Sequence, residues 1–198
     1  MRRKLKNLIW VTNDSLPRFT AILDANVIYP APVRDLLLNL ADQEIFSPKW
    51  SEIIHEEWIR NLLINRTDLS KSKLLRTVKI MNSVFPDAEV HGFEDLIDNL
   101  ELPDLDDRHV LAAAIHCNAD AIITFNQKDF PKKYVREYNI EVYNPDKFLN
   151  LLHKLSPEIV RQAFDNQLES LQHPAKTKQE LIDTLVKCNL KSAKKIFK

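Results

Sequence analysis

Short apolar runs alternating with helical patterns over residues 19–150 constrain the fold of this chain most. The clearest runs are FTAIL (19–23), ADAIITF (119–125) and IEVYNP (140–145), and Ile45–Phe46 is a shorter one. Continuous apolar runs of this length are typical of strands buried on both faces of a parallel sheet. Strands separated by helices predict an α/β fold with a mainly parallel sheet.

The spacing of apolar residues and the positions of capping residues predict the helices. Serine is a favoured N-cap residue, and Ser51 and Ser70 each precede a helical pattern. The expected helices start at Val33, run from Ser51 to about Ile64, run from Ser70 to before Pro86, and cover 94–99 and 107–116.

The strand pattern stops at Pro145, and only helical patterns follow. Ser156 is the expected N-cap of a helix whose first residue is Pro157, and TKQE (177–180) is a capping box that opens another helix. We therefore expect an α/β domain over 1–150 and a helical C-terminal extension over 151–198.

Composition excludes some functions and favours others. Gly92 is the only glycine, so neither a P-loop nor a glycine-rich dinucleotide fingerprint is present. Lys+Arg and Asp+Glu are equal at 28 each, but the charges are segregated: residues 94–107 carry seven acids and no base, and 187–198 carry five lysines and no acid. Such segregation fits cation binding and contact with a polyanion, although solvated charged faces would look the same.

Polar residues follow two of the predicted buried strands. Asp24 comes directly after TAIL, and Asn126 follows AIITF, with Asp129 one short turn beyond. Ligands of open α/β sheets bind at the carboxyl ends of the strands. The structural alternative is that Asp24 caps the next helix and that Asn126 only forms a turn.

A glutamate lies on the apolar face of the helix predicted after Ser51. At 100° per residue, Glu57 points between Ile53 and Ile54, whereas Glu56 points away from them. A carboxylate there is unfavourable unless it is paired or binds a metal. Glu57 is therefore a candidate ligand, and Glu56 is expected to be solvated.

Three aspartates precede the helix predicted over 107–116. Aspartates at a helix start commonly cap it, and Asp106 is the better candidate for that role. Asp107 shares the helix face that turns toward the sheet and is the better ligand, and Asp104 fits either role. Several converging carboxylates repel strongly unless a cation is bound, and oxygen ligands select Mg²⁺ or Mn²⁺. A bound ion of this kind equips a site for phosphodiester hydrolysis.

The order of LDANV, SEIIHEEWIRNL, LPDLDDRHVLAAAI and ADAIITFNQKDFP resembles that of the PIN-domain family, and more narrowly the VapC-type toxin ribonucleases of bacterial toxin–antitoxin systems. The resemblance covers about 19–150, and the tail is similar to the extension of a longer subgroup. It implies a PIN-like three-layer fold and an endoribonuclease that depends on Mg²⁺ or Mn²⁺. It also implies an RNA substrate, an antitoxin protein as partner and a homodimer.

The resemblance also assigns roles to residues. It places the catalytic and metal-binding acids at Asp24, Glu57 and Asp107, with support from Asn26, Asp104, Asn126 and Asp129. Asn126 departs from the aspartate that the family often has there, and Asp129 is a candidate to compensate for it.

Two other functions stay open at this point. One is a non-catalytic PIN-like module that binds RNA or protein. The other is a phosphatase that forms an aspartyl-phosphate on Asp24, although that chemistry often uses a second aspartate where this chain has Asn26. Two separated cysteines, an N-terminal apolar run (Leu8–Val11) too short for a signal peptide, and no run of transmembrane length predict a cytoplasmic protein without a membrane role.

Overall fold

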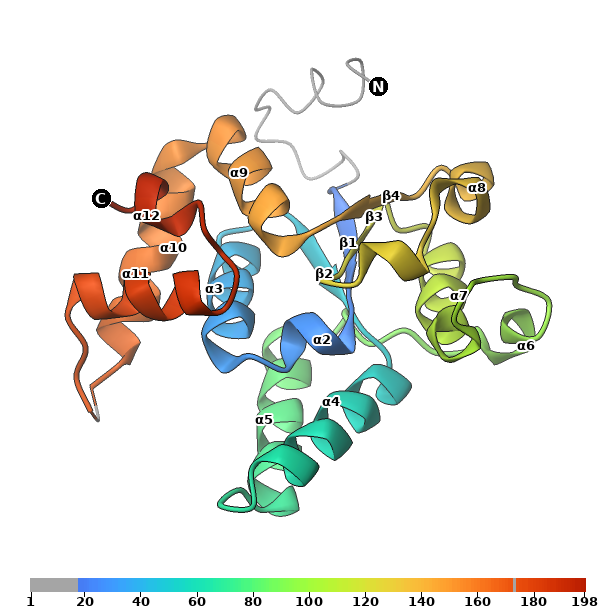
Figure 1. Cartoon of the computed structure of the whole chain (residues 1–198), viewed down its shortest axis with the longest axis horizontal. Coiled ribbons are helices and arrows are strands. Elements are labelled where there is room, and N and C mark those ends of the chain that lie inside the picture. Colours follow the sequence, from blue (N-terminus) through green and yellow to red (C-terminus); the bar gives the residue numbers. More distant parts are fainter. Residues whose placement is uncertain (1–17, 173) are drawn as a thin grey trace.

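A computed structural model describes residues 18–172 and 174–198 of the chain (Figure 1). Within this part, four parallel strands form one sheet in the order β2-β1-β3-β4. They are β1 (Thr20–Leu23), β2 (Ser47–Lys49), β3 (Ala121–Ile123) and β4 (Glu141–Tyr143). The basic start of the chain and the run Leu8–Val11 lie outside the described residues.

Helices connect the strands and cover both faces of the sheet, with α3 and α9 on one side and α7 on the other in Figure 1. The helices before β4 are α2 (Ala25–Ile28), α3 (Ala31–Asp42), α4 (Glu52–Asn65), α5 (Lys71–Val84), α6 (Glu94–Ile97), α7 (Arg108–His116) and α8 (Lys132–Val135). Three 3-10 turns join them: η1 (Leu105–Asp107), η2 (Gln127–Asp129) and η3 (Arg136–Tyr138). The predicted α/β class and parallel sheet are confirmed.

The two central strands form the middle of the core. The residues of β3 and the last three residues of β1 are fully buried, which explains their uninterrupted apolar character. The alanines 112–114 of α7 are also fully buried, and their small side chains allow this helix to pack closely on β1 and β3.

The edge strand β2 lies two residues beyond its predicted position. We expected Ile45–Phe46, but the strand is Ser47–Lys49 and contains Pro48. A proline lacks a backbone N–H and is tolerated on an edge strand, where one side needs no ladder partner. Phe46 is buried all the same and packs edge-on against Phe148, so the apolar pair contributes to the core without belonging to the strand.

Serine caps fix the starts of two helices as predicted. The Ser51 hydroxyl accepts a hydrogen bond from the N–H of Ile54, and the Ser70 hydroxyl accepts one from the N–H of Lys73. The expected capping box between Thr177 and Glu180 is also present. None of the helices in the described part of the chain has the length and apolarity that a membrane crossing requires.

Four helices follow β4 in the described part of the chain: α9 (Pro145–Leu155), α10 (Pro157–Ser170), α11 (Lys178–Lys187) and α12 (Ala193–Ile196). α10 packs on α3, and the buried Gln167 donates a hydrogen bond to the carbonyl of Pro32 at 2.9 Å. The rings of Phe164 and Phe197 stack with centroids 4.1 Å apart. Ser156 precedes α10 as expected, but its side chain makes no capping hydrogen bond to a described residue. α9 continues across residue 150, and the division at 150/151 remains a prediction.

Candidate active site

Asp24 lies at the carboxyl edge of the sheet, where β1 ends. Leu23 pairs with Ile123 across β1 and β3, so the next residues, Asp24 and Thr124, are neighbours. The Thr124 hydroxyl donates to Asp24 Oδ2 at 2.6 Å, and Asp24 is only 2% exposed. The chain thus holds a carboxylate rigidly inside the protein.

Asn26 connects the ends of the two strands. Its side-chain amide group donates to Asp24 Oδ2 and to the Thr124 hydroxyl, and its Oδ1 accepts from the N–H of Phe125 at 2.9 Å. The Thr124 hydroxyl accepts from the N–H of Asn126. Side chains thereby bind the backbone N–H groups of Phe125 and Asn126, and β3 ends earlier than the predicted strand over 119–125.

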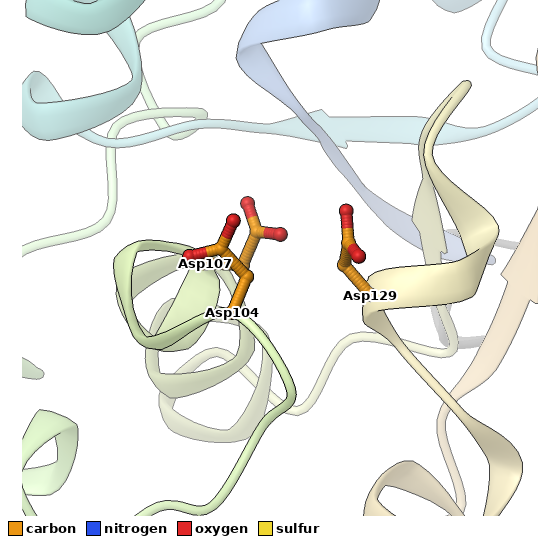
Figure 2. A group of neighbouring side chains, drawn as sticks. All are labelled: Asp104, Asp107 and Asp129. Atoms are coloured by element: carbon orange, nitrogen blue, oxygen red, sulfur yellow. The ribbon is translucent and has the colours of Figure 1, made fainter.

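Three aspartates lie close together beside this edge. Asp104, Asp107 and Asp129 each place a carboxylate oxygen within 4.8 Å of the others. Figure 2 shows Asp104 and Asp107 on the turn that leads into α7 and Asp129 facing them from the turn after β3. Carboxylates at about this separation repel by about 3 kcal/mol per pair at an effective dielectric constant near 20. The cluster is therefore unfavourable without protons or a cation.

The capping role expected for Asp106 belongs to Asp104. The Asp104 carboxylate accepts a hydrogen bond from the N–H of Asp106 at 3.0 Å and caps η1, whereas the Asp106 side chain is exposed. The prediction was wrong because a 3-10 turn precedes α7 and moves the capping position two residues toward the N-terminus.

The pKa values of two carboxyl groups at this site are shifted upward. Burial raises the pKa of Asp24 to about 6, against the opposing effect of the Thr124 hydrogen bond. Burial also raises the pKa of Asp107 to about 7. Four surrounding carboxylates raise it further: Asp24, Asp104, Asp129 and Glu57. The four other predicted acids therefore lie near enough to Asp107 to interact with it electrostatically, although only Asp104 and Asp129 join it in the cluster.

Glu57 takes the orientation that the helix periodicity predicted. On α4, Glu56 is exposed, whereas the Glu57 side chain is 27% exposed and its Oε2 lies 3.5 Å from Nε2 of His109. Burial is the largest cause of the raised pKa of Asp24, and the negative charge of Glu57 raises that pKa further. The structure thus brings Glu57 to the same site as the aspartates of the other segments.

Asn126 contacts Asp129 directly. Its side-chain amide group donates a hydrogen bond to Asp129 Oδ2, and Asp129 is 8% exposed. Of these two residues, Asp129 supplies the carboxylate to the cluster, and Asn126 orients it.

The donor set fits a hard divalent cation. Every charged oxygen in the cluster belongs to a carboxylate, the ligand type that Mg²⁺ and Mn²⁺ prefer. Oδ2 of Asp107 is buried and has no hydrogen-bond partner among the described residues. A buried carboxylate oxygen without a partner is costly, and coordination of a cation would satisfy it.

Sequence reasoning missed two residues of this site. Thr124 escaped notice because the longer predicted strand made Asn126 the counterpart of Asp24, although a threonine just after AII was a visible signal. The second missed residue is His109. It is 8% exposed and contacts Glu57, and its position two residues after Asp107 could have indicated this.

The fold and the site together define a class of protein: a parallel α/β domain with an acidic cluster at the carboxyl edge of its sheet. Comparison with known protein families agrees with this description. The family model of the PIN domain matches residues 20–128, more than half of the chain. The chain therefore belongs to the PIN-domain family, as its motifs implied. The family model of the VapC50 C-terminal domain matches residues 145–193, which include most of the C-terminal helices.

The comparison with curated proteins gives a particular relative. It is the "Putative ribonuclease VapC50" of Mycobacterium tuberculosis (strain ATCC 25618 / H37Rv), which is 34% identical over 98 residues. The match covers 50% of this chain and 57% of the relative, so the chain spans little more than half of that protein. No solved structure matches the chain.

Proposed function

We propose that the protein is an endoribonuclease that depends on Mg²⁺ or Mn²⁺ and acts as a VapC-type toxin. The observation that carries this proposal is the convergence of three aspartates within 4.8 Å, with a buried and unpaired Asp107 oxygen among the described residues. Membership in the PIN-domain family and the similarity to a relative that is named a ribonuclease support the choice of RNA as substrate.

The proposed metal site consists of Asp107, Asp104 and Asp129, with Asp24 and Glu57 beside it. A bound divalent cation supplies Lewis-acid activation of a phosphoryl oxygen and lowers the pKa of bound water. Asn26 and Thr124 hold Asp24 in place through hydrogen bonds to its Oδ2. Glu57 and His109 lie in contact and are positioned to accept and return a proton during hydrolysis.

The proposed partners follow from the same assignment. The VapC-type motifs support an antitoxin protein that binds this chain and suppresses its activity. A homodimer and a cytoplasmic location remain predictions. The phosphatase alternative is weaker, because Asp24 is 2% exposed and its Oδ2 already accepts two hydrogen bonds, which hinders attack on a phosphate ester.

A cleavage assay tests the proposal. Purified protein is incubated with end-labelled single-stranded RNA in Mn²⁺, in Mg²⁺ and in EDTA. Cleavage is expected with either metal and not with EDTA. Asp107→Asn should abolish it, whereas Asp106→Asn, an exposed neighbour, serves as the matched control and should retain it. RNA that stays intact with the wild-type protein in both metals would favour the non-catalytic alternative.

A further inference from the structure

A pocket lies where three loops of the chain meet. Its lining comes from the loop after β3, from the start of α9 and from the turn between α11 and α12: Phe125, Asn144, Asp146, Asn189 and Lys191. Its volume is about 340 Å³. The C-terminal helical part of the chain thus contributes three of its five lining residues, Asp146, Asn189 and Lys191, and the PIN domain contributes the aromatic wall.

This pocket adjoins the acidic site. In the sequence, Phe125 lies between Thr124 and Asn126. The Thr124 hydroxyl donates a hydrogen bond to Asp24, and the side-chain amide of Asn126 donates one to Asp129. Its backbone N–H donates to Oδ1 of Asn26. The N–H of Thr124 donates to the carbonyl of Tyr143, so the ends of β3 and β4 are neighbours. The pocket and the acids therefore occupy adjacent parts of one carboxyl edge.

Specific contacts hold the C-terminal turn against this edge. Oδ1 of Asp146 accepts hydrogen bonds from the N–H of Ser192 at 2.7 Å and from its hydroxyl at 2.5 Å. Asn189 has φ +67°, and this left-handed residue ends α11 and redirects the chain. In Figure 1 the loop between α11 and α12 lies beside the start of α9. Lys191, next to Ser192, is therefore anchored at the mouth of the pocket, although its side chain is exposed.

We propose that this pocket binds one nucleotide of a single-stranded RNA next to the cleavage site. In this arrangement Lys191 contacts a phosphate, the ring of Phe125 stacks on a base, and Asn144 and Asn189 hydrogen-bond base or ribose groups. Aromatic stacking combined with a cationic phosphate contact is the usual way of binding single strands. The proposal rests on the proposed ribonuclease function and gives the C-terminal helices a role in it.

The chemistry of the lining favours a nucleotide over a free anion. Asp146 places a carboxylate in the wall and weakens the binding of any phosphate by Lys191, so a ligand needs further contacts with the aromatic ring and the amides, which a free anion does not make. The side chain of Asn189 offers a donor and an acceptor, and the amide group of Asn144, whose Oδ1 accepts from the N–H of Asp146, offers a donor; these groups match base edges and ribose hydroxyls. An acidic protein segment would use the lysine alone and leave the aromatic wall unexplained.

Binding of a labelled RNA without catalysis tests the pocket. The probe is a fluorescein-labelled single-stranded RNA 12-mer of mixed sequence, and its affinity is measured by anisotropy in EDTA at several KCl concentrations. Lys191→Ala should weaken binding several-fold at low salt and reduce the slope of log affinity against log salt by about 0.7, one phosphate contact on a single strand. Phe125→Leu should weaken binding about tenfold, and Phe125→Tyr should retain it because the ring remains.

Lys178→Ala is the matched control. Lys178 is exposed at the first residue of α11, about 15 Å along the helix from its other end. It should change neither the affinity nor the salt slope. Thermal melting followed by circular dichroism verifies that each variant is folded, and Phe125→Tyr covers the case in which Phe125→Leu unfolds.

The outcomes separate this proposal from the ribonuclease proposal. If Lys191→Ala and Phe125→Leu, both folded, bind the 12-mer like the wild type while the wild type cleaves RNA, the pocket proposal is overturned and the nuclease stands. If the wild type binds but does not cleave with Mn²⁺, and Lys191→Ala binds more weakly with the lower slope, the pocket stands and the nuclease proposal is wrong. A wild-type protein that binds no RNA overturns the pocket.

Discussion

Replacing Asp24 with asparagine isolates the energetic effect of one buried negative charge. Asparagine has almost the same size and keeps an oxygen that can accept the hydrogen bonds from Thr124 and Asn26. The substitution removes the charge without creating a cavity. Its effect on stability should therefore follow the ionisation of Asp24.

The size of the effect follows from the pKa. Burial raises the pKa of Asp24 from 3.8 to about 6, a difference of about two pKa units. Each unit is equivalent to about 1.4 kcal/mol, so ionisation of Asp24 destabilises the folded protein by about 3 kcal/mol at pH 8. Between pH 3.8 and about pH 6, the folded state binds more protons than the unfolded chain does. The free energy of unfolding therefore falls as the pH rises through this range. Loss of the Asp24 charge also lowers the pKa of Asp107, which acts in the same direction.

Urea unfolding in EDTA, followed by tryptophan fluorescence, measures the prediction. At pH 8, Asp24→Asn should be more stable than the wild type by about 3 kcal/mol, and at pH 4 the difference should shrink to about 0.5 kcal/mol. The exposed Asp106→Asn should stay within about 0.5 kcal/mol at both pH values. A variant that is less stable than the wild type at pH 8, or a difference that does not change with pH, would refute the reasoning.

Three further predictions test other parts of the structure. Glu57→Gln should lower metal-dependent RNA cleavage at least 100-fold and Glu56→Gln less than threefold, because only Glu57 contacts the site; equal losses would contradict this assignment. Asp129→Asn should weaken Mg²⁺ binding about tenfold in calorimetric titration, and unchanged binding would exclude Asp129 as a ligand. Phe197→Ala should destabilise the protein by about 3–5 kcal/mol in urea unfolding, since it removes a buried ring stacked on Phe164, and a loss under 1 kcal/mol would show that α12 packs loosely.

The sequence alone predicted those features of the site that depend on periodicity. The inward direction of Glu57 follows from the helix repeat, and the place of Asp24 follows from the apolar strand before it. The partner of Asp24 could not be obtained in this way. It depends on the register between β1 and β3, which places Thr124 rather than Asn126 beside it. Register is a long-range property that no local pattern of this chain contains.

Local turn geometry explains two predictions that were wrong. The capping role of Asp104 in place of Asp106 follows from the 3-10 turn before α7, which residue preferences for capping do not reveal. The shift of β2 has a similar origin, because Ile45–Phe46 and Ser47–Lys49 are both compatible with a short edge strand. The two-residue difference was decided by pairing with Thr20 to Ile22. Neither error moved a candidate ligand away from the site.

The pairing of Ala21 with Ala121 in the centre of the sheet has a consequence for how the protein folds. These strands lie far apart in the sequence, and closing so long a loop is slow compared with forming local helices. The clustered aspartates Asp104, Asp107 and Asp129 lie near one end of that loop, whereas Asp24 lies at its other end. The complete site, with Asp24 beside the three clustered aspartates, therefore exists only when this slow, long-range step is finished.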